Sequence, residues 1–402
     1  MAGARAASKR AGSSRPHLRL VRPGERLAGR TGAVTHGRDR LLLLGATAAL
    51  VSVGLVMVLS ASSVQAYEQF GSSFMFFLRQ AVYAAVGAAG LWVSSRMRHD
   101  AWKHLSLPLL GGSVVLLFLV LIPGFGKVAG GSARWIEIGP VTIQPSELAK
   151  LAVIAYASAL LSARWKRIGD PRLLAIPLLP VIGVVCMLIL LQPDMGTAII
   201  IVSIVGILVF AAGARLKHLA VGAASLATLG LGLIFVEGYR WARFLSFLDP
   251  WNDPLGAGYQ NIQSAVALGS GGVFGLGLGA GRQKFGFLPN AHTDFIYSII
   301  GEELGLIGAL LVLVLFGLLL YAGVRIALHA PDAFGRMLAC GITGWFAIQA
   351  ITNLGAVTGL LPITGVPLPF VSFGGSALVV SLVAVGILLS ISRSGGRRRQ
   401  AG

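Results

Sequence analysis

The feature that most constrains the fold of this chain is a succession of apolar runs, each long enough to cross a lipid bilayer. The chain has 402 residues, of which 55% are hydrophobic and only 12% are charged. A membrane-spanning helix needs roughly 20 apolar residues, and ten segments can supply them. We therefore predict an all-α polytopic integral membrane protein, with transmembrane helices at about 41–61, 76–95, 104–122, 147–163, 172–191, 195–212, 216–236, 295–325, 336–356 and 371–392.

The basic residues between these runs predict the orientation of the chain in the membrane. Of the 33 Lys and Arg residues, 25 fall on the side of the N-terminal tail and 8 on the opposite side. By the positive-inside rule, both termini are therefore cytoplasmic. The formal charge of +18 lies in these tails and short loops, so we expect a membrane protein with no nucleic-acid partner.

The segments outside the spans predict the domain organisation. Residues 1–40 are rich in Arg, Gly, Ala and Ser and are expected to form a disordered basic cytoplasmic tail, and residues 393–402 form a second basic tail. Two longer segments face outward: residues 123–146 and, between the seventh and eighth helices, residues 237–294. A substrate that reaches the outer leaflet would meet its site there.

The two cysteines lie within apolar runs. Cys186 and Cys340 therefore support neither a disulfide framework nor a zinc site. The first apolar run follows a long basic tail and is long enough to span, so no cleavable signal sequence is expected.

Three carboxylates lie where the longer outer segment meets the eighth apolar run. Asp294 stands at the boundary, and Glu302 and Glu303 follow inside the run, where ionisable groups are costly and mark candidate functional sites. On an ideal helix, Glu302 lies about 80° round from Asp294 and about 12 Å deeper, with Glu303 opposite. At least one glutamate therefore needs a partner of its own, in a neighbouring helix. Alternatively, Asp294 caps the helix and the glutamates are neutral or paired structural groups.

The shorter outer segment carries polar residues that lead into the fourth apolar run. Arg134 and Trp135 lie in the loop, and Pro145 is well placed as a first helical residue, with Glu147 near the positive helix end. Glu147 and Lys150 are spaced i,i+3 and can pair one turn inside the membrane. These side chains form either a cationic, polar wall for an anionic lipid head group or an interfacial anchor with a self-neutralised pair.

The longer outer segment carries a second basic set. Arg240 and Arg243 share one face of a predicted interfacial helix, where two guanidiniums can clamp a pyrophosphate or act as snorkelling anchors. A glycine run over residues 269–281 precedes Lys284. No βαβ unit surrounds it, so it indicates a flexible or closely packed loop rather than a dinucleotide site.

Two outer turns and one histidine complete the polar features. Asp194 is predicted to cap the helix that follows it. Prolines and glycines over residues 361–376, which end at Ser376, indicate broken backbone that lines a polar cavity. His292 could ligate a metal, but one histidine beside one aspartate is a weak signal.

These motifs, in this order and topology, resemble the SEDS family of bacterial cell-wall proteins, which includes FtsW, RodA and SpoVE. The resemblance covers residues 40–392 and rests on the stretches 131–150, 247–251, 258–260, 288–305 and 368–376.

Local residues favour the FtsW-like division members over the RodA-like elongation members. They are Lys284 after Gln283, Ala291 before His292, and Phe370 after Pro369. The chain departs from residues common in the family at Asn290, Phe373 and Ala377, which leaves the family assignment intact.

The resemblance implies a peptidoglycan glycosyltransferase that polymerises lipid II at the outer face of the cytoplasmic membrane. It places the essential aspartate at Asp294, the expected base for the attacking 4-hydroxyl, and important roles at Trp135, Glu147 and Lys150. For the departing pyrophosphate we expect positive charge from Arg243 and Lys150. The weaker candidates for substrate binding are Arg134, Arg240, Lys284, His292, Gln260 and Ser376.

The resemblance also implies partners and a location. A cognate class B penicillin-binding protein would supply transpeptidation, alongside other divisome proteins at the septum. No cofactor is assigned with certainty, and a divalent cation, Mg²⁺ or Mn²⁺, could assist the pyrophosphate. The alternatives are an elongation polymerase, a lipid II flippase, a secondary transporter, for which we see no clear internal repeat, and a pure scaffold.

Overall fold

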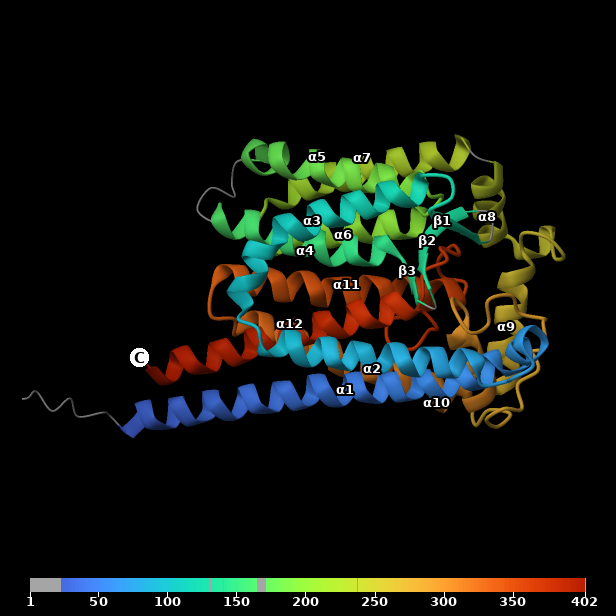
Figure 1. Cartoon of the computed structure of the whole chain (residues 1–402), viewed down its shortest axis with the longest axis horizontal. Coiled ribbons are helices and arrows are strands. Elements are labelled where there is room, and N and C mark those ends of the chain that lie inside the picture. The colour runs from blue at the N-terminus through green and yellow to red at the C-terminus, as the bar shows by residue number, and fades with distance from the viewer. Residues whose placement is uncertain (1–22, 130–131, 140, 165–170, 237, 402) are drawn as a thin grey trace, which may run out of the picture.

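The computed structural model describes residues 23–401, apart from 130–131, 140, 165–170 and 237 (Figure 1). Helices form most of this part of the chain and run roughly parallel and antiparallel to one another. They are α1 (Pro23–Phe70), α2 (Met75–Arg96), α3 (His99–Leu121), α4 (Pro145–Ala163), α5 (Pro171–Leu190), α6 (Met195–Ala211), α7 (Leu216–Val236), α8 (Gly238–Leu248), α9 (Tyr259–Gly271), α10 (Ile296–Leu328), α11 (Ala333–Val357) and α12 (Gly375–Ala401).

The predicted spans correspond closely to these helices. Among the described residues, seven helices are long and apolar enough to cross a membrane, and the apolar parts of α5 and α6 are shorter. α7 has the bounds predicted for the seventh span, while α3 begins at His99, five residues before the predicted start. The chain is therefore a polytopic, mainly helical membrane protein.

Part of each tail is helical, whereas residues 1–40 are predicted to be disordered. α1 begins at Pro23, so residues 23–40 are helical, and α12 continues to Ala401 through most of the predicted C-terminal tail. Adding turns to an existing helix avoids the cost of nucleation, and Pro23 suits a first helical position. The part of the N-terminal tail before Pro23 lies outside the described residues.

The outer segment 123–146 contains a small antiparallel sheet, which corrects its prediction as a loop in an all-α protein. Strands β1 (Gly126–Ala129), β2 (Ser132–Ile138) and β3 (Val141–Ile143) pair in the order β1-β2-β3. β2 ends with Ile136 and Ile138 on either side of Glu137, and all three residues of β3 are β-branched, which suits a pleated, half-buried surface. The strands are too short to stand out from the sequence.

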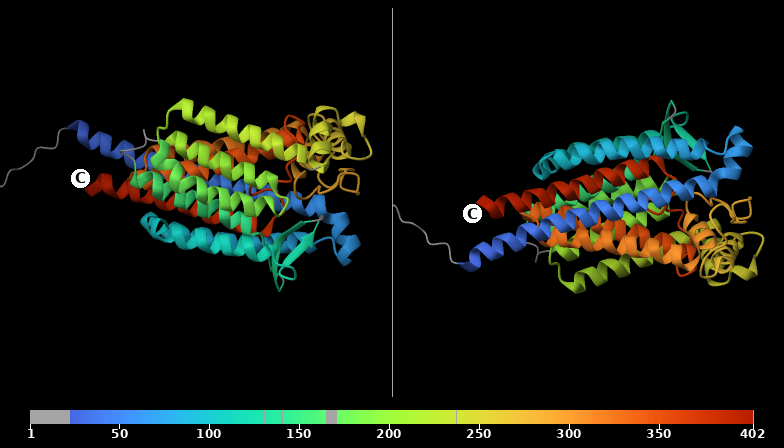
Figure 2. Two further views of the ribbon diagram at one scale, coloured as in Figure 1. Left: turned by 90° about the horizontal axis from the view of Figure 1, so that it is seen from above. Right: turned by 90° about the horizontal axis from the view of Figure 1, so that it is seen from below.

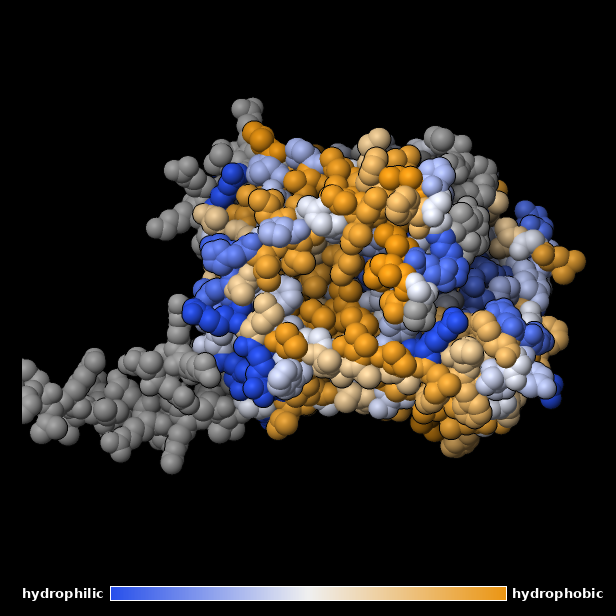
Figure 3. Space-filling view, viewed as in Figure 1, coloured by the Kyte–Doolittle hydropathy of each residue, from blue (hydrophilic) through white to orange (hydrophobic). Residues whose placement is uncertain are grey.

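α11, α4 and α12 lie at the centre of the bundle. The most apolar window of α11 is 72% buried, against 11% for α2, which faces outward. α12 packs along α2, α1 along α10, and α3 along α4. Figure 2 shows the sheet, α8 and α9 together at one end, while α12 ends at the other. An apolar band crosses the face in Figure 3 between two more polar ends.

Polar contacts hold the helices together at the end where α12 terminates. Arg40 donates to the Ser392 carbonyl over 2.8 Å, and His99 Nε2 lies 2.9 Å from Asp332 Oδ2. Both ends of the described chain therefore lie on one side of the bundle, as the prediction of two cytoplasmic termini requires.

Candidate active site

Asp294 lies in the last turn before α10, at the end of the bundle that carries the sheet. The turn begins at Asn290, whose carbonyl accepts hydrogen bonds from the backbone N–H groups of Thr293 and Phe295. Asn290 has a φ of 57°, in the left-handed region that asparagine adopts more readily than most residues. This conformation gives a physical reason for asparagine where the family pattern commonly has glutamate.

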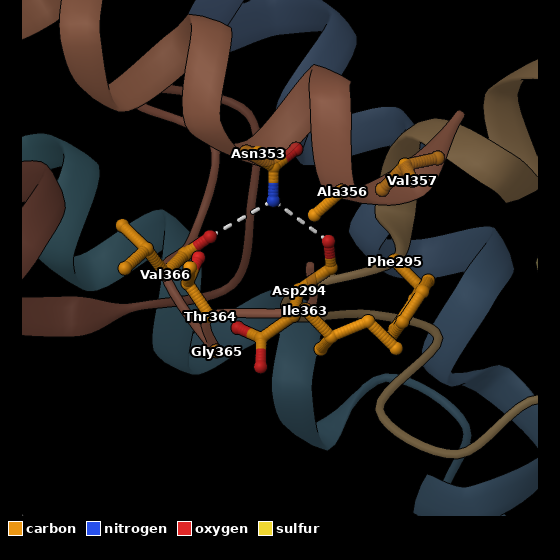
Figure 4. Close-up of a pocket in the computed structure, with 9 residues that line it drawn as sticks. All are labelled: Asp294, Phe295, Asn353, Ala356, Val357, Ile363, Thr364, Gly365 and Val366. Atoms are coloured by element: carbon orange, nitrogen blue, oxygen red, sulfur yellow. Dashed lines mark hydrogen bonds between the residues drawn. The ribbon is translucent and has the colours of Figure 1, made fainter. Parts of the chain in front are cut away.

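The Asp294 side chain borders a pocket of about 190 Å³ between α11 and the segment before α12 (Figure 4). A Cβ atom built on Gly365 would lie 3.7 Å from Asp294 Oδ2, so the carboxylate faces that segment. Irregular backbone over residues 363–366 borders the pocket, as predicted, but the lining is mainly apolar rather than polar. Its lining residues are Asp294, Phe295, Asn353, Ala356, Val357, Ile363, Thr364, Gly365 and Val366.

Hydrogen bonds from three directions fix the backbone around Asp294. The Asn353 amide donates to the Asp294 carbonyl over 2.7 Å. The Ser372 hydroxyl donates to the Thr293 carbonyl over 2.6 Å, and the Phe373 N–H donates to the His292 carbonyl over 2.9 Å. The carboxylate is therefore carried on a backbone segment held by both α11 and the start of α12.

Burial raises the pKa of Asp294 to about 6. The Arg243 and Arg134 guanidiniums oppose this rise in the pKa, whereas the Asp194 carboxylate adds to it. A carboxylate with a pKa in this range is mostly ionised at neutral pH and is a stronger base than an ordinary aspartate. The arrangement suits proton abstraction from a hydroxyl group.

Arg134 and Arg243 reach the neighbourhood of Asp294 from different elements. Arg134 lies on β2 and donates from Nε to the Gln192 carbonyl over 3.0 Å and from Nη2 to the Pro193 carbonyl, which joins the sheet to the turn before α6. Arg243 lies on α8 with an exposed side chain. The side chain of Arg240, also on α8, lies outside the described residues.

Asp194 acts as the predicted helix cap. It accepts hydrogen bonds from the Thr197 N–H at 3.2 Å and from the Thr197 hydroxyl at 2.8 Å, at the start of α6. The prediction is confirmed, and the capping role places a second carboxylate close enough to influence Asp294.

Glu147 and Lys150 pair as their spacing predicts. Their side-chain atoms lie 2.8 Å apart, and the Lys150 side chain is 0% exposed. Lys150 also donates to Gln349 Oε1 over 2.7 Å, and its ammonium lies 5.0 Å from the centroid of the Trp345 ring. This enclosed pair differs from the predicted wall for a lipid head group, because neither side chain reaches the surface of the pocket.

Glu302 and Glu303 have partners of their own, as the helical geometry predicts. Glu303 Oε1 lies 2.8 Å from Lys284 Nζ, and Ser60 on α1 donates to the same carboxylate. Glu302 accepts hydrogen bonds from the backbone N–H groups of Arg282 and Gln283. The two glutamates hold the glycine-rich segment against α10, and Lys284 is committed to this ion pair rather than to the pocket.

Comparison with known proteins decides the family of this chain. The FtsW/RodA/SpoVE family, whose description is cell cycle protein, matches residues 40–396. The chain belongs to the FtsW/RodA/SpoVE family.

Close relatives and solved structures agree with this assignment. Stage V sporulation protein E of Bacillus subtilis (strain 168) is 46% identical over 357 residues, 88% of this chain and 96% of that protein. A probable peptidoglycan glycosyltransferase FtsW of Geobacter sp. (strain M18) is 43% identical over 89% of this chain and 97% of that protein. The structure of RodA from Thermus thermophilus aligns with a TM-score of 0.65 at 29% identity, over 88% of this chain and 96% of that one.

A further solved structure belongs to a peptidoglycan synthase complex that coordinates polymerization and crosslinking. One of its chains aligns with a TM-score of 0.72 at 31% identity, over 88% of this chain and 97% of that one. The resemblance to the SEDS family is therefore confirmed over nearly the whole chain.

The remaining residues that the family resemblance suggested lie at several places around the outer end. Trp135 is half-buried on β2, opposite Lys127. Gln260 is half-buried in the first turn of α9, and the Ser376 hydroxyl accepts a hydrogen bond from the Gln144 N–H at the start of α4. Ser376 therefore joins α12 to α4, and none of these three residues is among the described residues that line the pocket at Asp294.

His292 is buried between two aromatic rings in this member of the family. Its ring centroid lies 4.9 Å from that of Phe76 and 5.5 Å from that of Phe373. Burial lowers the pKa of His292 to about 4, so the imidazole is neutral at physiological pH. A packed, neutral ring suits support of the Asp294 segment better than phosphate binding.

Two amides on α11 were missed by the sequence reasoning. Gln349 and Asn353 are 1% and 2% exposed and lie one turn apart in an apolar helix. Polar side chains inside a membrane-spanning segment are costly, and that signal could have identified them.

The described residues contain one group of His, Asp or Glu side chains close enough to share a metal ion: His99, Asp100 and Asp332. It lies at the end of the bundle opposite Asp294. Near the pocket, Asp194 uses both carboxylate oxygens to cap α6. Among the described residues, no second group of this kind lies near Asp294.

Proposed function

We propose that this chain is a peptidoglycan glycosyltransferase that polymerises lipid II at the outer face of the bacterial cytoplasmic membrane. The observation that carries the proposal is the carboxylate of Asp294, with its raised pKa, at the border of a pocket at the outer end of a family member. The FtsW relatives are named as probable peptidoglycan glycosyltransferases, which supports the same activity here.

In the proposed reaction, Asp294 takes the proton of a sugar 4-hydroxyl as that oxygen attacks the anomeric carbon of a second, lipid-linked sugar. The bond from the anomeric carbon to the pyrophosphate oxygen breaks, and undecaprenyl diphosphate leaves with the bonding electron pair. One glycosidic bond replaces one glycosyl phosphate bond, with inversion. The reaction requires a base for the hydroxyl proton and positive charge near the departing pyrophosphate, so both groups must lie in the same site.

Arg243 is the leading candidate for the leaving group. Its exposed guanidinium lies at the outer end and already influences the pKa of Asp294. Arg134 acts on the same carboxylate but also holds the turn before α6. Lys150 and Lys284 are buried in ion pairs, so we assign them to support of the site rather than to the pyrophosphate.

Purified protein with lipid II in detergent tests the function most simply. A detergent micelle has no inner and outer leaflet, so a flippase, a transporter or a scaffold yields no glycan there. We expect glycan chains on a gel. Lipid II that stays monomeric, with and without the transpeptidase partner, would overturn the proposal.

We also propose a single-span class B penicillin-binding protein as partner, among other divisome proteins. The relation to a chain of the synthase complex supports this, since that complex coordinates polymerization and crosslinking. Co-purification in mild detergent with the cognate transpeptidase is the expected result. Full activity alone, with no co-purification, would argue against an obligate complex.

We place the protein at the division septum. The FtsW-like residues Lys284, Ala291 and Phe370 support this, as do the FtsW relatives. Depletion in the native cell separates the two family roles. Filamentous or branched, unseptated cells support division, whereas rounded cells that still form septa would reassign the protein to elongation.

A further inference from the structure

The buried surface of α11 carries a short row of polar side chains that ends at Asp294. Gln349 Oε1 accepts hydrogen bonds from Lys150 Nζ at 2.7 Å and from Trp345 Nε1 at 2.6 Å. Gln349 Nε2 donates to the Pro367 carbonyl over 2.8 Å. The amide therefore joins the buried cation of α4 to the segment that forms the far wall of the pocket.

Asn353 continues the row one helical turn later. Its Nδ2 donates to the Asp294 carbonyl over 2.7 Å and to the Val366 carbonyl over 2.9 Å (Figure 4). These two carbonyls belong to segments 72 residues apart in the sequence, and each borders the pocket. One side-chain amide thus sets the separation of the two walls.

We propose that Asn353 is a positioning residue for Asp294, and that Gln349 connects the opposite wall of the pocket to the buried Lys150–Glu147 ion pair. Asn353 does not touch the reacting atoms in this proposal; it acts through the backbone of Asp294. The kinetic part of the inference rests on the proposed glycosyltransferase function. Its structural part, the placement of the carboxylate, does not.

The physical reason is that Asn353 is the described donor to both carbonyls, one at the half-buried Asp294 and one at the buried Val366. An unsatisfied buried carbonyl costs free energy, so loss of Asn353 favours a shift of the Asp294 segment toward solvent. Reacting groups must lie within a few tenths of an ångström of the productive geometry, and misplacement by about 1 Å can cost on the order of 100-fold in rate. The amide is therefore expected to influence turnover more than substrate binding.

The enclosed Lys150 has a structural role in this proposal. Its ammonium contacts Glu147 and Gln349, and its side chain is 0% exposed. Through Gln349 and the Pro367 carbonyl, it holds the segment opposite Asp294. A residue deep in α4 can thus affect the reaction without contact with the pyrophosphate.

The test compares Asn353→Leu and Asn353→Ser with Ser94→Ala. Ser94 is the control: it is 2% exposed, and its hydroxyl donates to the Val383 carbonyl of α12 over 3.0 Å, near the end of α2 and away from the segment that holds Asp294. The serine variant leaves a small polar side chain that admits water, so it guards against misfolding of the leucine variant. Folding is followed by size-exclusion chromatography and thermal unfolding in detergent.

The first readout needs no turnover. A carbodiimide reacts with protonated carboxyl groups, and mass spectrometry resolves the labelling of Asp294 as pH is varied. The charged groups that act on Asp294 are Arg243 on α8, Arg134 on β2 and Asp194 before α6, and none of them is changed. If Asn353 holds the carboxylate in its buried place, the labelling midpoint falls by about one pH unit in both Asn353 variants, because solvent favours the ionised form.

The second readout is polymerisation of lipid II. We expect kcat to fall by about 100-fold in Asn353→Leu and by roughly tenfold in Asn353→Ser, with KM changed by less than about threefold. Ser94→Ala should keep both the labelling midpoint and kcat. An unchanged midpoint in the Asn353 variants, or equal losses in Ser94→Ala, would overturn the inference. A wild-type protein that makes no glycan would overturn the proposed function instead, and the labelling result would still decide the role of Asn353.

Discussion

Three carboxylates lie within ten residues of one another around the start of α10, and their surroundings give them different tasks. Glu302 accepts backbone N–H groups, and Glu303 pairs with Lys284. Asp294 is half-buried at the pocket, and its backbone rather than its carboxylate is held by Asn353. Only Asp294 combines a raised pKa with a position at the pocket border.

The raised pKa of Asp294 predicts a pH dependence of activity. A base must be ionised, so kcat/KM should rise with pH through about 6, the pKa to which burial raises this group, and level off above about 7. Initial rates of lipid II polymerisation between pH 4.5 and 8.5 measure this. An acidic limb near pH 4, the ordinary value for aspartate, would contradict the assignment.

At the residue scale, the sequence predicted what depends on local spacing. The Glu147–Lys150 pair follows from an i,i+3 interval, and the Asp194 cap from its place before a span. Asp294 was a candidate from its place at the boundary of a span, but its role as the essential base came only through the family resemblance. The contact of Asn353 with residue 294 joins positions 59 apart, and no local pattern encodes it.

Among the elements, α10 and the glycine-rich segment before it depend on close backbone contact. α10 contains a break at Gly305, which has a φ of 67°. A Cβ at Gly305 would lie 2.3 Å from the Gly275 nitrogen, so the two backbones touch. The glycine run is therefore a packed loop, one of the two forms that the sequence left open.

Gly275 and Gly279 offer a matched pair for this packing. Both have a φ of 80°, but a Cβ at Gly275 would lie 2.2 Å from the Glu303 carbonyl oxygen, whereas one at Gly279 meets nothing within 4 Å. Gly279→Ala should cost about 1–2 kcal/mol through the left-handed backbone alone, and Gly275→Ala about 2–5 kcal/mol. Unfolding temperatures in detergent measure both. Equal losses would show that the segment is not packed against α10.

The Lys284–Glu303 ion pair gives a second prediction for the same segment. Its side chains are 3% and 0% exposed, while those of the Lys127–Glu137 pair in the sheet are 48% and 49% exposed, and both pairs are 2.8 Å apart. Glu303→Gln leaves a buried cation and should cost about 3–5 kcal/mol. Glu137→Gln should cost less than about 1 kcal/mol. Restoration of stability by adding Lys284→Met would attribute the loss to the uncompensated charge; a persistent loss would not.

At the element scale, the apolar spans were predictable because the bilayer requires a minimum length of each. The small sheet was not, because β1, β2 and β3 have 4, 7 and 3 residues and lie between two strong helix signals. The extension of α1 back to Pro23 was missed for another reason. Its polar composition indicates disorder when residues 23–40 are considered without the helix that they continue.

The whole molecule has a polar end on each side of an apolar band, and the distribution of Lys and Arg predicts which side is cytoplasmic. Cysteine substitutions at Leu255 and at Arg98 test this orientation. The two positions lie at opposite ends of the bundle, and Leu255 is 88% exposed while the Arg98 side chain is 86% exposed. A membrane-impermeant maleimide should label Leu255→Cys in intact spheroplasts and Arg98→Cys only after permeabilisation. The reverse pattern would invert the topology and place Asp294 inside.

Turnover of lipid II by purified Asp294→Asn decides whether this carboxylate is the general base. Because burial raises the folded-state pKa above the unfolded value, ionised Asp294 lowers stability above about pH 6, so the variant should unfold at the same or a higher temperature at pH 7.5. Polymerisation should fall by about 10²- to 10⁴-fold, the usual contribution of a general base, while Glu137→Gln, another outer carboxylate, keeps its activity. Polymerisation by Asp294→Asn within a few-fold of wild type would contradict the account.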